Sequence, residues 1–142
     1  MRYLGLDLGT KRLGIAISDR SGLIASPYEV LTYKDASETL PRIKNIIENE
    51  KVSEIALGLP KNMDGSLGFA STRSIEYKKL LESEIDIPII LVDERLSTVE
   101  AERYLLDEDM SRIKRKGKID AVAASVILNT YMRMKGNEQN EK

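Results

Sequence analysis

Hydrophobic and polar positions along the first third of the chain predict three short strands. Two turn segments, 9–12 and 19–22, separate the apolar runs and contain the Gly, Thr, Asp and Ser residues typical of tight connections. Two short connections in succession indicate an antiparallel meander, because antiparallel neighbours need only a tight turn between them. Pro27 favours an edge position for the last strand. The expected strands are Tyr3–Leu8, Leu13–Ser18 and Leu23–Leu31.

The pattern then changes to alternating helices and strands. Apolar residues recur at helical spacing in further stretches, one of which begins with the capping-box sequence Ser97-Thr98-Val99-Glu100. Two short, wholly apolar runs between these stretches predict strands that are buried on both faces. The expected helices cover 40–47, 70–81, the segment from Ser97 and Ile119–Met134, and the expected strands are Ile55–Leu59 and Pro88–Val92.

This order of elements predicts an α/β fold with one mixed, five-stranded sheet. Helical crossovers make the fourth and fifth strands parallel to a neighbour, and the handedness of such crossovers restricts where they can lie. The simplest arrangement places the fourth strand beside the first and the fifth beyond it, which gives the strand order 3-2-1-4-5 with flanking helices. We expect a single domain over residues 1–135 and a polar C-terminal tail over 136–142.

Acidic residues are expected to gather at one edge of this sheet. Asp7 lies inside the apolar run Tyr3–Leu8, where a buried charge costs several kcal/mol unless a metal ion, a ligand or a hydrogen bond compensates for it. The pair Asp93-Glu94 follows the fifth strand, and Asp120 begins the final helix. Ligands of open α/β sheets bind at the carboxyl ends of parallel strands, which is where these residues are expected to meet.

Such a cluster of carboxylates predicts a divalent metal site. Like charges within a few ångströms raise each other's pKa, and two divalent ions about 4 Å apart would neutralise them and clamp a phosphodiester. The chain has no Cys and no His, which excludes disulfides, Cys/His zinc sites and a His general base. Oxygen ligands favour Mg²⁺ or Mn²⁺. We expect a metal-dependent phosphodiester hydrolase whose ligands come from Asp7, Asp93, Glu94 and Asp120.

Composition indicates in what kind of protein, and in which compartment, this site is expected. The chain has 142 residues, of which 42% are hydrophobic and 32% are charged, and these values suit a soluble domain with its own hydrophobic core. No run approaches the roughly 18 apolar residues of a membrane span, and the first residues lack a signal-peptide pattern. We expect a cytoplasmic protein with no membrane partner, present as a monomer or a homodimer.

Local basic charge indicates a structured nucleic acid as the partner. The net charge is only −1, but the segment Arg112–Lys118 is dominated by basic residues. Either this segment is a solvated loop, or it contacts phosphate groups and releases counterions. The same two interpretations apply to the basic residues of the first turn. Arg95 adjoins the acidic residues and is expected to orient a carboxylate or the scissile phosphate. The expected nucleic-acid-binding residues are Lys11, Arg12, Arg95, Arg112, Lys114, Arg115, Lys116 and Lys118.

Four segments in order carry a family resemblance: Gly5–Gly14, Gly58–Gly65, Asp93–Thr98 and Lys118–Ala124. With these segments, the chain resembles the YqgF (RuvX) family over nearly its whole length. The resemblance implies a ribonuclease H-like fold related to Holliday-junction resolvases. It also implies a nuclease that matures the 5′ end of pre-16S ribosomal RNA in the bacterial cytoplasm.

The resemblance also assigns roles to the acidic residues. It implies catalytic carboxylates at Asp7, at Glu94 or its neighbour Asp93, and at Asp120. The carboxylate that resolvases carry on strand four has no match, since Gly58-Leu59-Pro60 is apolar. The choice between Asp93 and Glu94 as the second ligand therefore stays open.

Other interpretations of these residues also stay open. Asp7 can accept hydrogen bonds from the following turn, Asp120 suits the first turn of a helix, and the Asp93-Glu94 pair can bind nearby basic residues. Asp7-Leu8-Gly9-Thr10 also resembles the first phosphate loop of actin- and sugar-kinase-like phosphotransferases, which need two lobes. The alternative functions are a Holliday-junction-resolving DNA nuclease and a non-catalytic, RNA-binding ribosome-assembly factor.

Overall fold

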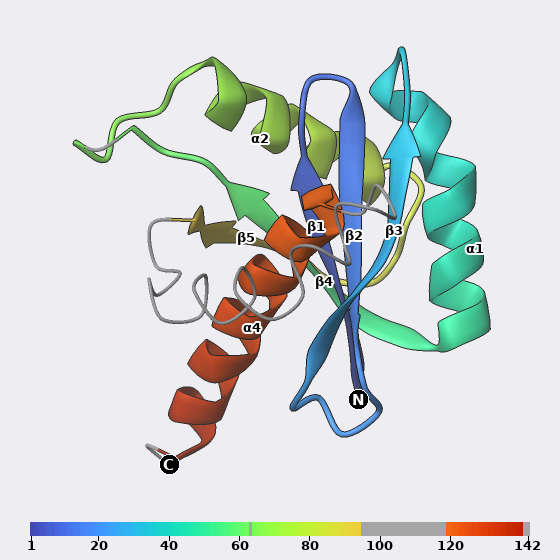
Figure 1. Cartoon of the computed structure of the whole chain (residues 1–142), viewed down its shortest axis with the longest axis vertical. Coiled ribbons are helices and arrows are strands. Elements are labelled where there is room, and N and C mark those ends of the chain that lie inside the picture. The colour runs from blue at the N-terminus through green and yellow to red at the C-terminus, as the bar shows by residue number, and fades with distance from the viewer. Residues whose placement is uncertain (63, 95–118, 141–142) are drawn as a thin grey trace.

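The structure, a computed structural model, describes residues 1–62, 64–94 and 119–140. Figure 1 shows a central sheet with helices packed against it. The described elements are β1 (Arg2–Leu8), β2 (Arg12–Ser18), β3 (Ala25–Thr32), the 3-10 turn η1 (Ala36–Thr39), α1 (Leu40–Glu50), β4 (Val52–Leu59), α2 (Phe69–Glu82), β5 (Ile89–Asp93) and α4 (Ile119–Asn140). The expected helix from Ser97 and the candidate residues Arg95, Arg112, Lys114, Arg115, Lys116 and Lys118 lie outside the described residues.

The sheet has the strand order that the sequence predicts, β3-β2-β1-β4-β5. β1, β2 and β3 pair antiparallel, whereas β4 runs parallel to β1 and β5 runs parallel to β4. Parallel neighbours end at the same edge of a sheet, and from this edge β1 turns back into β2 whereas β4 leads to α2. The ends of β1, β4 and β5 therefore lie together, as the interpretation of the acidic residues requires.

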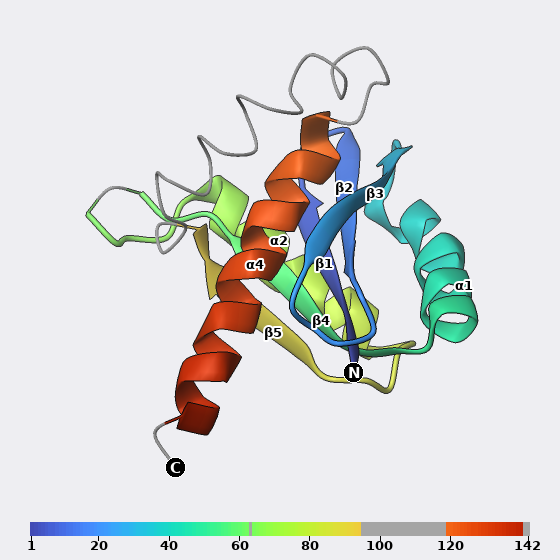
Figure 2. The ribbon, with the colours of Figure 1, turned by 60° about the horizontal axis from the view of Figure 1, so that its bottom comes forward.

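Alternation along the strands divides the core into two layers. Leu4 and Leu6 of β1 belong to the larger apolar cluster, which contains the buried residues of α1 and α2, whereas Tyr3 packs with Leu128 and other residues of α4. Figures 1 and 2 show α4 across one face of the sheet and α1 and α2 on the other. Odd-numbered positions of β1, including Asp7, therefore lie on the α4 face.

Glycines let α4 come very close to this face. A Cβ atom on Gly5 would lie 2.7 Å from the carbonyl oxygen of Ala124 and 2.8 Å from the Cβ of Leu128. A Cβ on Gly14 would collide with the carbonyl group of Asp120. The first turn of α4 is thus seated directly on β2, next to the end of β1.

A polar cluster holds the other half of α4. The hydroxyl of Tyr131 donates a hydrogen bond to the Glu54 carboxylate at 3.0 Å, and Nζ of Lys135 donates to the same carboxylate at 2.6 Å. The ring of Tyr131 packs edge-on against Tyr3, with 5.8 Å between the centroids. The helix is therefore fixed to β4 and β1 by a charged side chain that would otherwise be costly to bury.

Several element boundaries differ from the sequence prediction; for example, α1 continues to Glu50 and β4 begins at Val52 rather than at Ile55. β3 begins at Ala25 because the Asp19 carboxylate accepts hydrogen bonds from the amides of Leu23 and Ile24, at 2.9 and 3.0 Å, and holds both residues in the preceding turn. α4 continues past the expected end at Met134 to Asn140. Even so, no helix in the described part of the chain combines the length and the apolar character needed to cross a membrane.

Candidate functional site

Asp7 and Glu94 meet at the carboxyl edge of the sheet, on the face that α4 covers. Asp7 is the penultimate residue of β1, and Glu94 directly follows β5. Because side chains alternate along a strand, Asp7 shares its face with Tyr3, and Glu94 shares that face with Val92. A hydrogen bond joins the two side chains across the end of β4.

Both of these carboxyl groups have a raised pKa. Burial, the charge of Asp7, the hydrogen bond with Asp7 and the charge of Asp93 together raise the pKa of Glu94 to about 7. Burial also raises the pKa of Asp7, against the hydrogen bond with Glu94, which lowers it; the charge of Asp120 adds to the rise. Glu94 is therefore the donor and Asp7 the acceptor. Two carboxyl groups this close need a proton or a cation between them.

Gly58 of β4 provides the space for the Glu94 carboxylate. A Cβ atom on Gly58 would lie 2.6 Å from Oε1 of Glu94 and 2.5 Å from Cδ1 of Ile127. Gly58 pairs in parallel register with Val92, so that the carboxyl group of Glu94, just beyond the end of β5, can lie over β4. The apolar end of β4, which departs from the resolvase pattern, is thus covered by a carboxylate from the neighbouring strand.

Asp120 reaches the same edge from the first turn of α4. Asp7 pairs with Gly14 across β1 and β2, and Gly14 contacts the backbone of Asp120. The Asp120 carboxylate forms an ion pair with Arg12, with 3.0 Å between Oδ2 and Nε. Asp120 therefore lies beside the Asp7–Glu94 pair, close enough to act on the pKa of Asp7, and its carboxylate is held by Arg12.

Asp93 belongs to the opposite face of the sheet. It alternates with Glu94, and its Oδ2 lies 3.7 Å from Nζ of Lys61. Of the two residues between which the sequence left the choice open, the structure brings Glu94 to Asp7. Asp93 influences the pair only through its charge, which contributes to the raised pKa of Glu94.

The residues at this edge fit a hard divalent cation by their chemistry, although they do not form a complete binding group. No three acidic side chains of residues 1–62, 64–94 and 119–140 come together as metal ligands. The Asp7–Glu94 pair offers carboxylate oxygens around a position that already requires positive charge, which suits Mg²⁺ or Mn²⁺. A third ligand requires the Asp120 carboxylate to turn from Arg12 towards Asp7.

The turn between β1 and β2 presents two of the expected phosphate-binding residues. Lys11 and Arg12 are both exposed there. The amide of Gly9 donates to the carbonyl of Arg12 at 2.8 Å, and the amide of Tyr33 donates to the carbonyl of Lys11 at 2.9 Å. The hydroxyl of Tyr33 also donates to the carbonyl of Gly9. The turn is thus braced by its own backbone and by Tyr33, and Asp7 is not needed to cap Gly9.

Comparison with known proteins identifies the family. The family model described as "RuvX: Holliday junction resolvase" matches residues 1–134. The chain belongs to the RuvX family. A "Putative pre-16S rRNA nuclease" of Halothermothrix orenii is 49% identical over 141 residues, which cover 99% of this chain and 98% of that protein. A protein of the same name from Bacillus subtilis is 43% identical over 134 residues, which cover 93% and 97%.

Solved structures with a similar fold confirm the expected ribonuclease H-like fold. Thermus thermophilus RuvC in complex with a Holliday junction substrate matches with a TM-score of 0.58 and 14% identity, covering 95% of this chain and 96% of that one. The fowlpox virus Holliday junction resolvase matches with a TM-score of 0.58 and 16% identity, covering 94% and 99%. At these identities the likeness concerns the fold alone.

Two basic residues near the carboxyl edge of this RuvX chain, Lys61 and Arg73, were not among the sequence candidates. Burial raises the pKa of Tyr33, and the charge of Arg73 on α2 opposes that rise, so Arg73 lies near the braced turn. The sequence could have indicated Arg73, because this residue lies on the polar side of the predicted helix 70–81, next to the core position Ser74.

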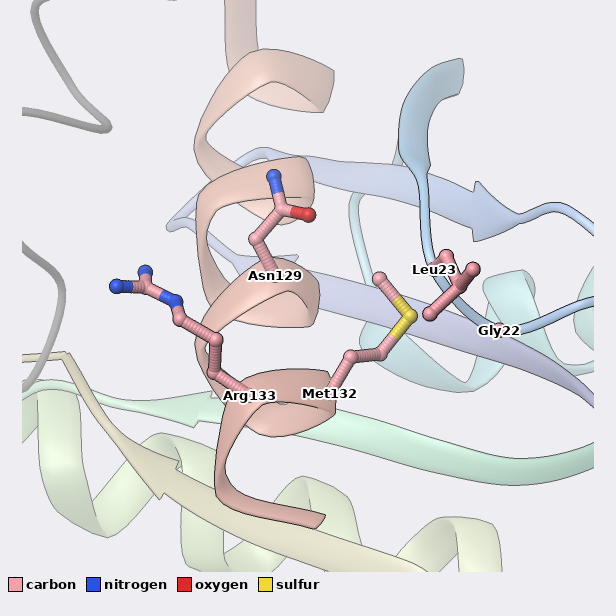
Figure 3. Close-up of a pocket in the computed structure, with 5 residues that line it drawn as sticks. All are labelled: Gly22, Leu23, Asn129, Met132 and Arg133. Carbon is pink, nitrogen blue, oxygen red and sulfur yellow. The ribbon is translucent and has the colours of Figure 1, made fainter. Parts of the chain in front are cut away.

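A separate cavity lies far from the acidic edge. It has a volume of about 310 Å³ and is lined by Gly22, Leu23, Asn129, Met132 and Arg133 (Figure 3). The turn that contains Gly22 is at the amino end of β1, where the N-terminal amine donates to the carbonyl of Arg20 at 2.9 Å. Asp7 is at the other end of that strand, so this cavity and the carboxylates are at opposite edges of the sheet.

Proposed function

We propose that this chain is a metal-dependent nuclease that hydrolyses phosphodiester bonds at the 5′ end of pre-16S ribosomal RNA. Membership of the RuvX family and the names of the relatives support a nuclease. The structural observation that carries the proposal is the hydrogen-bonded pair of Asp7 and Glu94 at the carboxyl edge, with Asp120 beside it.

Asp7, Glu94 and Asp120 would hold Mg²⁺ or Mn²⁺ at this edge. When bound, such an ion makes water a better nucleophile and offsets the negative charge of the phosphodiester. Asp93 is left out of this ligand set, because it lies on the other face with Lys61. Asp120 would join this ligand set only when its carboxylate turns from Arg12 towards Asp7.

The basic residues around the edge would hold the substrate. Lys11 is exposed in the braced turn, and Arg12 is placed both to orient the Asp120 carboxylate and to offer its remaining donors to a phosphate. Lys61 lies on the other side of the acidic pair, at the end of β4. A strand that crosses the carboxyl edge would thus meet cations before and after the acids, and the phosphate between them would lie over Asp7 and Glu94.

Cleavage of a branched DNA is the second candidate activity. The family model carries the description of a Holliday junction resolvase, and a solved neighbour holds a junction substrate. The same carboxylates would serve either substrate, because both contain the same phosphodiester bond. The acidic pair therefore does not distinguish RNA from branched DNA, and the substrate is identified by the experiment below.

The test compares four proteins on two substrates in Mg²⁺ and in Mn²⁺. Wild type, Asp7→Asn, Glu94→Gln and the surface control Asp86→Asn are incubated with a pre-16S 5′-leader RNA and with a four-way DNA junction. We expect wild type and Asp86→Asn to cleave the RNA, and both site variants to lose cleavage. Equal cleavage by wild type and Asp7→Asn would reject this site, and cleavage of the junction alone would favour the second candidate.

A growth experiment separates the nuclease from a non-catalytic assembly factor. Strains that depend on this protein would carry either Asp7→Asn or the double charge reversal Arg115→Glu with Lys116→Glu. A nuclease predicts that Asp7→Asn impairs growth and 5′-end maturation in the cytoplasm. A non-catalytic RNA-binding factor predicts that only the charge reversal does so.

A further inference from the structure

The ion pair of Arg12 and Asp120 keeps the third acid of the carboxyl edge apart from the other two. Nε of Arg12 lies 3.0 Å from Oδ2 of Asp120. Glu94 is hydrogen-bonded to Asp7, whereas Asp120 acts on Asp7 only through its charge. Within the described residues, no three acidic side chains gather as metal ligands. The edge therefore has two acids joined to each other and a third that is paired with a cation.

The backbones on both sides of this ion pair are fixed. Gly14 contacts the backbone of Asp120 so closely that a Cβ atom on Gly14 would lie 2.0 Å from its carbonyl oxygen. The carbonyl of Arg12 accepts a hydrogen bond from the amide of Gly9 at 2.8 Å. Gly14 is also the strand partner of Asp7. Asp120 can therefore approach Asp7 by a change of side-chain rotamer, without movement of either backbone.

The pair is open enough to be separated by a ligand. The exposed fraction is 62% for the side chain of Arg12 and 32% for that of Asp120. Exposed ion pairs are weak, and breaking one changes an equilibrium constant by at most about fivefold. A ligand that binds either partner more strongly than this can take it from the other.

Each partner of the pair suits one ligand of the proposed reaction. A carboxylate binds a hard divalent cation, and a guanidinium group binds the oxygens of a phosphodiester. While Arg12 and Asp120 are paired, each neutralises the other and attracts its own ligand less. A ligand on one partner releases the other partner for the second ligand. The cation and the phosphate therefore favour each other's binding, and this coupling is reciprocal.

We propose that Arg12 is a positioning residue that keeps Asp120 out of the metal site until a phosphodiester or a divalent cation separates the pair. This inference rests on the proposed function and deepens it, since it couples the substrate phosphate on Arg12 to the completion of the ligand set by Asp120. In the free protein the same ion pair neutralises a carboxylate that would otherwise repel Asp7 and Glu94.

A double-mutant cycle tests the coupling with the metal alone. Mg²⁺ binding to the full chain is measured by calorimetry at pH 8, without nucleic acid. Arg12→Gln should bind Mg²⁺ about fivefold more tightly than Lys11→Gln, a matched control that removes the same charge from the adjacent position of the turn. In the Asp120→Asn background the two substitutions should have equal effects, because there is no carboxylate to release.

A phosphodiester without a base tests the other half of the coupling. The Mg²⁺ titrations are repeated in sodium dimethyl phosphate and in sodium chloride of the same ionic strength. Dimethyl phosphate should strengthen Mg²⁺ binding to wild type and to Lys11→Gln more than to Arg12→Gln. In nitrogen-15 NMR spectra of wild type, the Nε–H signal of Arg12, assigned by its absence from Arg12→Gln, should move when either ligand is added.

Three results would overturn the inference. The first is an equal Mg²⁺ affinity of Arg12→Gln and Lys11→Gln. The second is an Arg12 signal that saturating Mg²⁺ leaves unchanged, and this measurement does not depend on the folding of any site variant. The third is Mg²⁺ binding that Asp120→Asn does not weaken, because Asp120 would then not belong to the ligand set.

Cleavage assays distinguish this inference from the proposed function. If wild type cleaves the RNA and Asp7→Asn does not, while Arg12→Gln and Lys11→Gln bind Mg²⁺ equally, the coupling is rejected and the nuclease stands. If no substrate is cleaved but the cycle gives the expected difference, the coupling stands and hydrolysis is rejected. A wild type that binds neither Mg²⁺ nor Mn²⁺ would overturn both.

Discussion

The carboxylate of Glu94 lies over Gly58, a residue of the neighbouring strand. The space exists because β4 has no side chain at this position: a Cβ there would be 2.6 Å from Oε1 of Glu94. An acid that directly follows β5 is thereby brought within hydrogen-bonding distance of Asp7 on β1, across the strand between them. The absence of one side chain therefore decides where the acidic pair forms.

Gly58→Ala should displace the Glu94 carboxyl group and lower cleavage of the RNA substrate at least tenfold, by analogy with other changes that disturb the support of a metal ligand. The added methyl group also presses on Ile127, and such overpacking costs about 1–3 kcal/mol of unfolding free energy. Cleavage rates and urea unfolding measure the two effects. Unchanged cleavage would show that the position of Glu94 does not matter.

Gly136→Ala should stabilise the protein. Gly136 lies within α4, and a Cβ there would meet nothing within 4 Å. Alanine reduces the freedom of the unfolded chain and favours the helix, which is worth about 0.4–1 kcal/mol. Urea unfolding measures the gain. A loss of stability would mean that the helix does not extend through this residue.

The stability of the metal-free protein should fall as the pH rises through 7. The pKa of Glu94 is about 7 in the folded protein, above its ordinary value of 4.5. Its protonated form therefore favours folding below pH 4.5, and this contribution is lost as the pH rises through 7. Thermal unfolding in EDTA at pH 5 and pH 8 should show a smaller decrease for Glu94→Gln than for wild type. Equal decreases would contradict the raised pKa of Glu94.

Divalent cations should stabilise the folded protein at pH 8. A cation that binds only the folded state raises the unfolding free energy by RT ln(1 + [L]/Kd), about 2.7 kcal/mol at one hundred times Kd. We expect Mg²⁺ and Mn²⁺ to raise the melting temperature of wild type and of Asp86→Asn, but not of Asp7→Asn, and EDTA to reverse the increase. An equal increase in all three proteins would place the binding elsewhere.

Glu54→Ala should loosen α4. The change leaves the Tyr131 hydroxyl and the Lys135 ammonium group without their common acceptor, which costs about 1–3 kcal/mol. Glu84→Ala provides the control, because the pair of Glu84 and Lys44, with 2.7 Å between the charged atoms, is exposed and is worth at most about 1 kcal/mol. Urea unfolding measures both losses of unfolding free energy. Similar values for the two variants would mean that the Glu54 cluster stabilises α4 no more than an exposed ion pair does.

The strand order could be predicted because the connections carry strong signals. Two tight turns followed by helical crossovers restrict the sheet to few arrangements, and the observed order is the simplest of them. The acids of β1 and β5 were expected at one edge for the same reason. That Glu94 rather than Asp93 lies next to Asp7 follows from alternation, but only once it is known which face α4 covers. A signal for that face was present: Gly5, Gly14 and Gly58 mark the side that accepts a close neighbour.

Features that depend on side-chain contacts could not be predicted. The apolar residues Leu23 and Ile24 continue the strand pattern, and only the hydrogen bonds from their amides to Asp19 keep them out of β3. In the same way, no spacing in the sequence indicates that Arg12 holds the Asp120 carboxylate. Both cases are contacts made after the elements have packed, and hydrophobic periodicity contains no information about them.

The close packing of α4 on Gly14 and Gly5 affects when, during synthesis, the three acids can come together at the carboxyl edge. Asp120 comes from the last described helix, which the ribosome synthesises after all five strands. Domains generally fold as units, so the sheet and the Asp7–Glu94 pair are not expected to be complete before α4 has emerged. A nascent chain would thus lack this edge until residues 119–140 have been synthesised.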